Sequence, residues 1–363
     1  MRTIARHPLT LLLSAALALS SAGVQAAEPL VYVSGYGPEI IGYTLDGSGK
    51  LTEVSRTPGG SNPSFLAWSP DRKNLYAVNE GNGGGKVLSF AIDHASGKLT
   101  KTGEGSMGEA GSACHVSVHP SGKWVFTASY GSGHVTVMPI KADGSIGDAV
   151  DVQMAGKNAH QTVSNKDGTL LFVPTLGIDQ VQVYRVDAVK GKLTQVTSIA
   201  LAKGVGPRHC ALSHDEKLLY VINEYGDSIT TFRDDGKIGF KDIGTVPTLP
   251  EGVAGDKNSC AHIVVSPDGK TIYGSNRGHN SLAIFRVSDD GAKLTPSGHE
   301  TAGGEINVPR NFTLTPDGAL ALVASQKGNA VTVLKVDAAT GLLTRIGSQQ
   351  VGPGPSFVGV IPR

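Results

Sequence analysis

The feature that most constrains this chain is a short turn motif that recurs at nearly regular intervals along most of its length. Each copy is a variant of Ser-Pro-Asp-Gly, as at residues 266–269, and successive copies are 45 to 53 residues apart. Short polar side chains in such turns bond the local backbone, so the motif marks a repeated structural unit. The six copies begin at Ser69, His119, Ser164, Ser213, Ser266 and Thr315.

The rest of each repeat indicates short β-strands. An apolar segment follows each turn, as at residues 74–78 and 218–222, and an alternating apolar and polar segment comes next, as at residues 86–93. Alternation is typical of a strand with one buried face. A repeat of about 40–50 residues with several short strands is typical of a β-propeller blade, and the pattern predicts an all-β, seven-bladed propeller. A Gly-Lys-Leu-Thr element, often loosened, then appears in each unit, at Gly49, Gly97, Gly144, Gly191, Gly236, Ala292 and Gly341.

The first blade lacks the turn motif, and its innermost strand is predicted at the other end of the chain. Residues 355–363 (Pro-Ser-Phe-Val-Gly-Val-Ile-Pro-Arg) match residues 63–71 (Pro-Ser-Phe-Leu-Ala-Trp-Ser-Pro-Asp) in order and type. The C-terminal strand should therefore pair with the N-terminal strand near residues 31–34 and close the ring. Closure removes the open sheet edges at which strands of other chains pair.

The first 26 residues are interpreted as a secretory signal peptide. Arg2 and Arg6 precede an apolar stretch over residues 9–19, and residues 24–26 (Val-Gln-Ala) resemble a small-residue cleavage site. The stretch is shorter than the roughly 20 residues that a membrane-spanning helix needs, which makes a membrane anchor the less favoured alternative. The propeller domain then covers residues 27–363, and we expect a periplasmic or secreted protein without a membrane span.

Charge and cysteine content narrow the class of partner. The chain carries 32 Lys and Arg against 31 Asp and Glu, without a basic block, so a nucleic-acid partner is not expected. The three cysteines, Cys114, Cys210 and Cys260, are too few for a disulfide scaffold. All three fall on predicted inner strands, where we expect them to be free and buried. We expect the protein to act as a monomer.

A column of polar side chains is predicted at one mouth of the central channel. The innermost strand of each blade begins on the face where the second strand ends, because the two strands are antiparallel neighbours. When the seven inner strands are aligned, four place a histidine in one column and two place an arginine just before it. The inner strands contribute His115, His160, Arg208, His209, His262 and Arg310, and the ends of the second strands add Glu80, Tyr130, Glu224 and Arg277.

These residue types suit acid–base or hydrolytic chemistry on an anionic substrate. Histidine titrates near neutral pH, and a glutamate beside it can act as a base or orient the imidazole. Arginine binds a carboxylate or phosphate through two parallel hydrogen bonds and stabilises a developing oxyanion. A metal is the rival explanation, but zinc needs three or four converging ligands, whereas residues on successive blades ring an axis. We therefore expect neither a metal nor a cofactor.

At these residues the sequence resembles the seven-bladed lactonase family, which includes the bacterial propeller-type 6-phosphogluconolactonase and the fungal carboxymuconate lactonising enzyme. The resemblance covers essentially the whole propeller, and its specific matches are residues 206–209 (Gly-Pro-Arg-His), 220–224 (Tyr-Val-Ile-Asn-Glu), 262–269 and 276–277 (Asn-Arg). It implies a catalytic set of His160, Arg208, Glu224 and Arg277, without a metal. His209 and His262 match further family positions and, with His115, Arg310 and Glu80 of the channel mouth, form the expected substrate-binding set.

The leading expectation is the hydrolysis of a small anionic or sugar-derived lactone. Phosphogluconolactonases of the family act in the cytoplasm, whereas this chain carries an export signal, so the lactone itself stays open. Two alternatives remain: a muconate-type lactonising enzyme (a cycloisomerase), and a non-catalytic propeller that binds a periplasmic ligand or protein, since a fold alone implies no activity. An electron-transfer role lacks a Cys-x-x-Cys-His haem motif.

Overall fold

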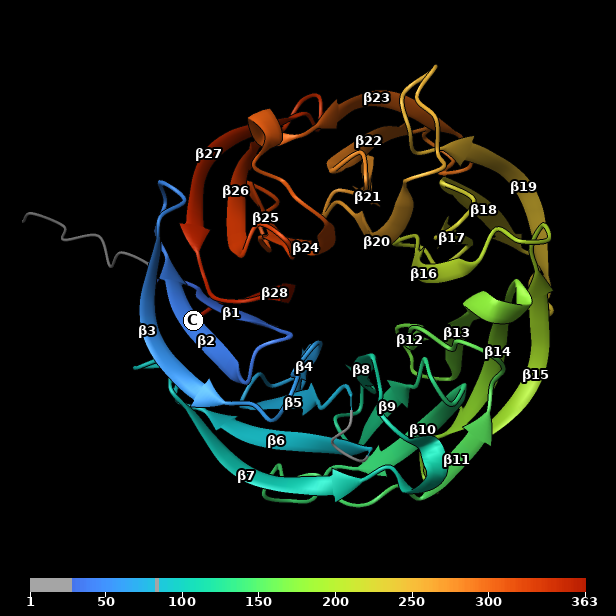
Figure 1. Ribbon diagram of the computed structural model, residues 1–363. Coiled ribbons are helices and arrows are strands. Elements are labelled where there is room, and N and C mark those ends of the chain that lie inside the picture. Colours follow the sequence, from blue (N-terminus) through green and yellow to red (C-terminus); the bar gives the residue numbers. More distant parts are fainter. Residues whose placement is uncertain (1–27, 82–84) are drawn as a thin grey trace, which may run out of the picture.

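The computed structural model describes residues 28–81 and 85–363, which form a ring of seven four-stranded antiparallel sheets around a central channel (Figure 1). The predicted all-β, seven-bladed propeller is confirmed. The proposed signal peptide, residues 1–26, lies outside the described residues. Within the described part of the chain, no helix has the length and apolar character needed to cross a membrane.

Each blade begins with an innermost strand at the channel and ends with an outermost strand at the rim. In that order, the N-terminal blade contains β28 (Pro355–Ile361), β1 (Leu30–Gly35), β2 (Glu39–Leu45) and β3 (Leu51–Pro58). The second contains β4 (Leu66–Trp68), β5 (Asn74–Val78), β6 (Lys86–Ile92) and β7 (Leu99–Ser106). The third contains β8 (His115–Val118), β9 (Trp124–Ala128), β10 (His134–Pro139) and β11 (Asp151–Met154). The fourth contains β12 (Val163–Ser164), β13 (Leu170–Thr175), β14 (Gln180–Asp187) and β15 (Lys192–Ala200).

The last three blades follow the same order. The fifth contains β16 (Pro207–Leu212), β17 (Leu218–Asn223), β18 (Ser228–Asp234) and β19 (Phe240–Pro247). The sixth contains β20 (Ser259–Val265), β21 (Thr271–Arg277), β22 (Ser281–Val287) and β23 (Leu294–Glu300). The seventh contains β24 (Pro309–Leu314), β25 (Leu320–Ser325), β26 (Ala330–Val336) and β27 (Leu343–Gln350). In the connections that the structure describes there are three single 3-10 turns: η1 (Gly108–Ala110), η2 (Leu176–Ile178) and η3 (Ala302–Gly304).

The two ends of the chain close the ring as the sequence match predicts. Strand β28 pairs antiparallel with β1 in a register that sets Leu30 opposite Ile361 and Val33 opposite Val358. Figure 1 shows the C-terminal strand on the inner side of the N-terminal blade. The N-terminal blade therefore depends on a strand that comes from the far end of the sequence.

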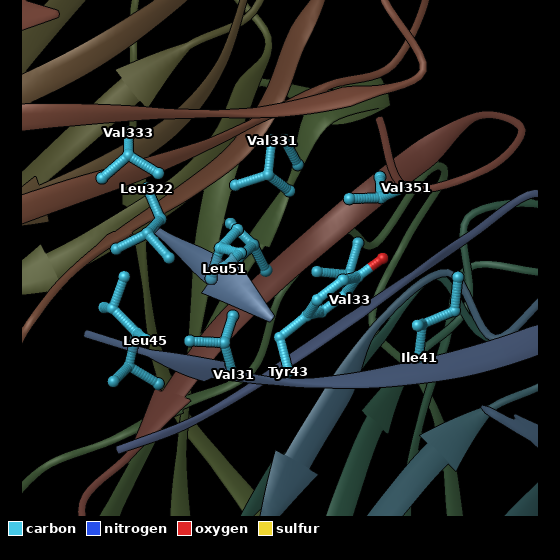
Figure 2. Packing of buried hydrophobic residues seen from close by; sticks show 13 residues of the cluster. Val31, Val33, Ile41, Tyr43, Leu45, Leu51, Leu322, Val331, Val333 and Val351 are labelled. Carbon is cyan, nitrogen blue, oxygen red and sulfur yellow. The ribbon is translucent and has the colours of Figure 1, made fainter. Parts of the chain in front are cut away.

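The apolar core lies between neighbouring blades. One cluster joins Val31 and Tyr43 of the N-terminal blade to Leu322, Val331 and Val333 of the seventh blade (Figure 2). Fully burying a valine or leucine side chain contributes about 1.5–3 kcal/mol. Because each sheet buries apolar side chains on both faces, adjacent blades stabilise one another around the whole ring.

The recurring Gly-Lys-Leu-Thr element is explained by contacts between blades. The hydroxyl group of Tyr273 in one blade donates to the carbonyl oxygen of Gly341 in the next, at 2.7 Å. Tyr220 likewise donates to Gly291, the residue directly before Ala292, at 2.8 Å. Both glycines adopt positive φ, at 72° and 73°, which a glycine adopts without steric cost. The motif thus shapes a turn whose carbonyl group accepts a hydrogen bond from the tyrosine of the preceding blade.

The Ser-Pro-Asp-Gly motif forms the turn between the first and second strands of a blade. In the sixth blade the hydroxyl of Ser266 donates to Asp268 Oδ1 at 2.6 Å, and the same oxygen accepts the backbone N–H of Lys270 at 3.0 Å. Ser69, Ser213 and Thr315 repeat this pattern. These turns occupy one face of the ring, and the starts of the inner strands lie on the other.

Candidate active site

The candidate catalytic residues lie at strand ends on the face opposite the Ser-Pro-Asp-Gly turns. Arg208 and His209 belong to β16, Glu224 directly follows β17, and Arg277 ends β21. Strands β16 and β17 set Pro207 opposite Asn223, which brings the start of one strand to the end of the other. The antiparallel pairing therefore gathers these residues at one channel mouth.

The inner strands are irregular at the candidate positions. The register shifts between Pro207 and His209, so that Arg208 has no cross-strand partner in β17. Corresponding shifts occur between Cys260 and Ile263 in β20, and around Arg310 in β24. A β-bulge bends its strand and re-aims the extra side chain. In β16 the bulge lets two consecutive side chains, Arg208 and His209, both take part in the site.

Glu224 is held between two guanidinium groups. Its Oε2 atom lies 2.8 Å from Arg208 Nε, and its Oε1 atom lies 2.9 Å from Arg277 Nη2. Each arginine also donates to a carbonyl oxygen of β20: Arg208 to Ala261 at 2.6 Å and Arg277 to Cys260 at 2.8 Å. Both carboxylate oxygens and both guanidinium groups are thus fixed in position.

Arg208 is the most deeply buried charge of this group, since its side chain is 2% exposed against 13% for Glu224 and 11% for Arg277. Burial, with Arg277 adding repulsion and Glu224 opposing it, lowers the pKa of Arg208 to about 9. The guanidinium group still carries its charge at neutral pH. A buried charge of this kind is tolerated because it is paired and hydrogen-bonded.

Beside Arg208 the channel mouth narrows to a recess with a cavity volume of about 10 Å³. That volume is about the minimum that holds one water molecule. Arginine, carboxylate and imidazole groups therefore surround a water-sized space. The recess is lined by Ser64, Phe65, Glu80, Cys114, His160, Arg208, His209, Arg310 and Ser356.

A second charged group borders the recess. The hydroxyl group of Tyr36 donates to the carboxylate of Glu80 at 3.3 Å, and the Arg310 guanidinium lies 5.3 Å from the centre of the Tyr36 ring. Burial raises the pKa of Tyr36 to about 12, so its hydroxyl group stays protonated and remains a donor.

Sequence reasoning missed Tyr36, because the N-terminal blade lacks the turn motif that anchors the alignment. The residue after β1 corresponds to Glu80 after β5, and that correspondence could have identified it.

His160 lies on the wall of the recess as a neutral base. Its ring packs edge-on against Tyr130 and His209, with centroids 5.7 and 5.2 Å apart, and its Nδ1 atom lies 3.8 Å from Cys114 Sγ. Burial, reinforced by the charge of Arg208, holds the pKa of His160 well below its usual range. The ring is therefore neutral at pH 7, whereas the sequence alone predicted titration near neutrality.

The other three histidines form a layer across the channel. His209 lies below Arg208, while His115 and His262 line a larger cavity of about 500 Å³ that opens toward the Ser-Pro-Asp-Gly face. The centroids of the Phe65 and His115 rings are 4.2 Å apart, and Phe65 borders both cavities. The structure thus brings His160, Arg208, His209, Arg310 and Glu80 together at the recess, and Glu224 and Arg277 behind Arg208. His115 and His262 lie toward the opposite end.

The three cysteines lie on, or directly before, inner strands of the ring. Cys114, Cys210 and Cys260 are all buried and unbridged, as expected. Burial raises the pKa of Cys114 to about 12, so its thiol lines the recess without being a nucleophile. Among residues 28–81 and 85–363, no group of three or more His, Cys, Asp or Glu side chains is arranged to hold a metal ion.

Comparison with known proteins agrees with the fold and with the family resemblance. A 6-phosphogluconolactonase of Pectobacterium atrosepticum is 31% identical over 340 residues, which cover 92% of this chain and 99% of that protein. A 6-phosphogluconolactonase of Bacillus subtilis is 30% identical over 339 residues, 90% of this chain and 95% of that protein. The solved structure of a periplasmic gluconolactonase of Pseudomonas aeruginosa is 28% identical and superimposes with a TM-score of 0.84, over 92% of this chain and 99% of that one.

The family described as "Lactonase, 7-bladed beta-propeller" matches residues 31–360, from the second residue of β1 almost to the end of β28. The match therefore spans all seven blades and the strand that closes the ring. This chain belongs to the seven-bladed β-propeller lactonase family.

Proposed function

We propose that this protein is an exported lactonase that hydrolyses the ring ester of a sugar-acid lactone at the Arg208 recess. The observation that carries the proposal is the recess itself, where a neutral His160 and the charged Arg208 line a cavity of about 10 Å³. Ester hydrolysis needs an activated water molecule and a stabilised oxyanion. A base that can activate water, His160, and a cation that can stabilise an oxyanion, Arg208, therefore line the same water-sized space.

His160 is the proposed general base. It accepts a proton from water as the water oxygen attacks the lactone carbonyl carbon, and it returns that proton to the ring oxygen as the carbon–oxygen bond breaks. Burial, and then the charges of Arg208 and Arg310, disfavour a protonated His160 in the free protein. The oxyanion that forms during attack offsets those charges, so the imidazolium is favoured when it is needed.

The arginines are the proposed oxyanion and substrate contacts. Arg208 and Arg310 line the recess, while Arg277 approaches from the far side of Glu224. Since both oxygens of Glu224 are occupied by guanidinium groups at 2.8 and 2.9 Å, its proposed role is to hold Arg208 in place beside His160. A fixed donor stabilises the transition state without reorganising during the reaction.

The proposed substrate is an unphosphorylated lactone outside the cytoplasm. The formal charges of Arg208, Arg277 and Arg310 against those of Glu80 and Glu224 leave one net positive charge, which suits a neutral or singly charged substrate. The apparent signal peptide at residues 1–26 favours the periplasm or secretion. The similarity to a periplasmic gluconolactonase supports the same location and the same substrate class.

A hydrolysis assay with a pH indicator tests this function. The protein without residues 1–26 is compared on gluconolactone, 6-phosphogluconolactone and a carboxylated muconate-type lactone, with spontaneous hydrolysis subtracted. We expect turnover on gluconolactone that exceeds turnover on the phosphorylated compound. A preference for the phosphorylated lactone would contradict the proposed substrate class, and a folded protein with no rate above the blank on any lactone would favour a binding protein.

A further inference from the structure

Below the recess, a chain of three side chains runs from Arg208 into the channel. Arg208 Nη1 lies 3.2 Å from His209 Nε2, and His209 Nδ1 lies 2.7 Å from His262 Nδ1. His209 is buried, and its ring meets that of His262 at nearly a right angle, with centroids 5.0 Å apart. The second contact is as short as a strong hydrogen bond, although both atoms are imidazole nitrogens.

The chemistry of the three groups allows one arrangement of protons. A guanidinium group can only donate, so His209 Nε2 must be the acceptor. Burial, reinforced by the charge of Arg208, holds the pKa of His209 well below its usual range, so this ring is neutral and its proton is on Nδ1. His209 Nδ1–H then donates to His262 Nδ1, which leaves the proton of His262 on Nε2. Hydrogen-bond direction therefore runs from Arg208 through His209 to His262.

We propose that His262 is a positioning residue of the active site, which sets the tautomer of His209 and through it the orientation of Arg208. This inference rests on the proposed function in that Arg208 is the group whose placement matters for turnover. His262 lies away from the recess and lines the opposite cavity of about 500 Å³. It acts on the reaction without touching the substrate.

Two contacts keep His262 in place for this role. Its backbone N–H donates to Ser275 Oγ at 2.9 Å, and its ring packs against Phe312 with centroids 5.3 Å apart. Without the His262 acceptor, the buried Nδ1–H of His209 would lose its partner. His209 could then move its proton to Nε2, where it would oppose the N–H of Arg208. A buried donor without a partner is costly, so the guanidinium group would be displaced.

Nitrogen-15 NMR of the histidine rings tests the proton arrangement independently of activity. At pH 7 we expect His209 to show a protonated Nδ1 and an unprotonated Nε2, and His262 to show the reverse. Assignment uses the loss of signals in single His209→Gln and His262→Asn variants. The opposite tautomers, or a doubly protonated ring at either position, would overturn the proposal even if the protein proves to be a lactonase.

A matched pair of variants tests the consequence for turnover. His262→Asn keeps an acceptor oxygen near the place of Nδ1, whereas His262→Leu has a similar size and no acceptor. We expect the Asn variant to keep kcat within about threefold, and the Leu variant to lose about tenfold or more in kcat with little change in KM.

Equal losses in the Asn and Leu variants would identify a merely structural residue and contradict the proposal. If the Leu variant does not fold, the ring tautomers of the unaltered protein still decide. If the unaltered protein hydrolyses no lactone, the proposed function fails, while the NMR result still stands or falls on its own.

Discussion

The two ends of the central channel are built from the same inner strands and differ in almost every property. One end has the Ser-Pro-Asp-Gly turns, regular strand pairing and a cavity of about 500 Å³ with many apolar side chains. The other has bulged strands, three arginines, two glutamates and a recess of about 10 Å³. Where the repeats agree, the residues make the fold, and where they diverge, the residues form the candidate site.

The same contrast applies to histidine. His119 belongs to a turn, where its ring bonds Ser121 at 2.8 Å and the Gly168 carbonyl oxygen of the next blade at 3.0 Å. His160 lines the recess, where it lies near Cys114 and the charge of Arg208. His119 and His160 are both buried. The first has a structural role at one end of the channel, and the second has the proposed role of a base at the other.

The largest effect is expected from removing the strand that both ends share. Deleting residues 355–363 removes β28, which contributes Ser356 to the recess and Phe357 to the opposite cavity, and it exposes the edge of β1. We expect loss of cooperative unfolding and aggregation, measured by calorimetry and light scattering. Deleting only residues 362–363, which lie beyond β28, is the control. A melting curve like that of the full protein would contradict closure through β28.

The next effect separates the two ends by activity. His160→Ala removes the proposed base and should lower kcat on the best lactone by about 10²–10⁴-fold, as is usual for acid–base groups, with little change in melting temperature. At the opposite end, Asp268→Asn weakens a turn hydrogen bond and should cost about 1 kcal/mol of stability with kcat unchanged. Full turnover in the His160 variant would move the site elsewhere.

Acid should destabilise the protein through the histidines of the channel. Burial lowers the pKa of His262 to about 3 and those of His115, His160 and His209 well below the usual range. As pH falls below about 6.5, the histidines of the unfolded chain bind protons that the same rings do not bind in the folded protein. The unfolding free energy therefore falls by about 1.4 kcal/mol per pH unit for each ring.

Urea unfolding at pH 7.0 and at about pH 5.5 measures this loss, in a window above the range where most carboxylates titrate. His115→Asn removes one of the four rings and should reduce the pH dependence of the unfolding free energy by about 1.4 kcal/mol per pH unit. An unfolding free energy that is equal at the two pH values would show that the folded rings bind protons as readily as the unfolded chain does, and an unchanged slope in the variant would show the same of His115.

The smallest expected effect concerns the contacts between blades. Tyr220→Phe removes the hydrogen bond to Gly291 and should cost about 1 kcal/mol in unfolding free energy. Tyr184→Phe is the matched control, because the buried Tyr184 hydroxyl has no partner among the residues that the structure describes. Equal costs in the two variants would mean that the tyrosine-to-glycine contact does not stabilise the ring.

The fold could be predicted almost completely, because its determinants are local and repeated. The segment predicted after the first turn, residues 74–78, is β5 (Asn74–Val78) itself, and the segment at residues 218–222 falls one residue short of β17. The likeness of residues 355–363 to residues 63–71 was enough to predict how β28 closes the ring. Each of these signals depends on side chains near one another in sequence.

The site could be predicted only in outline, since its geometry depends on features with no local signal. One aligned column contains His160 and His262, yet the first lines the recess and the second the opposite cavity. Bulges in β16 and β20 change the side of the sheet toward which the following side chains point. A bulge of this kind is not visible in the residue pattern. Burial, which sets the charge of each histidine in the channel, is likewise a property of the assembled ring.

The location of bound product tests the central claim most directly. A crystal structure of the protein with gluconate, the product of gluconolactone hydrolysis, would show which end of the channel holds the reaction. The predicted result is a gluconate carboxylate in contact with Arg208 and Arg310, above the recess and within reach of His160. Gluconate bound only in the opposite cavity, among Phe312 and Val264, would contradict the account.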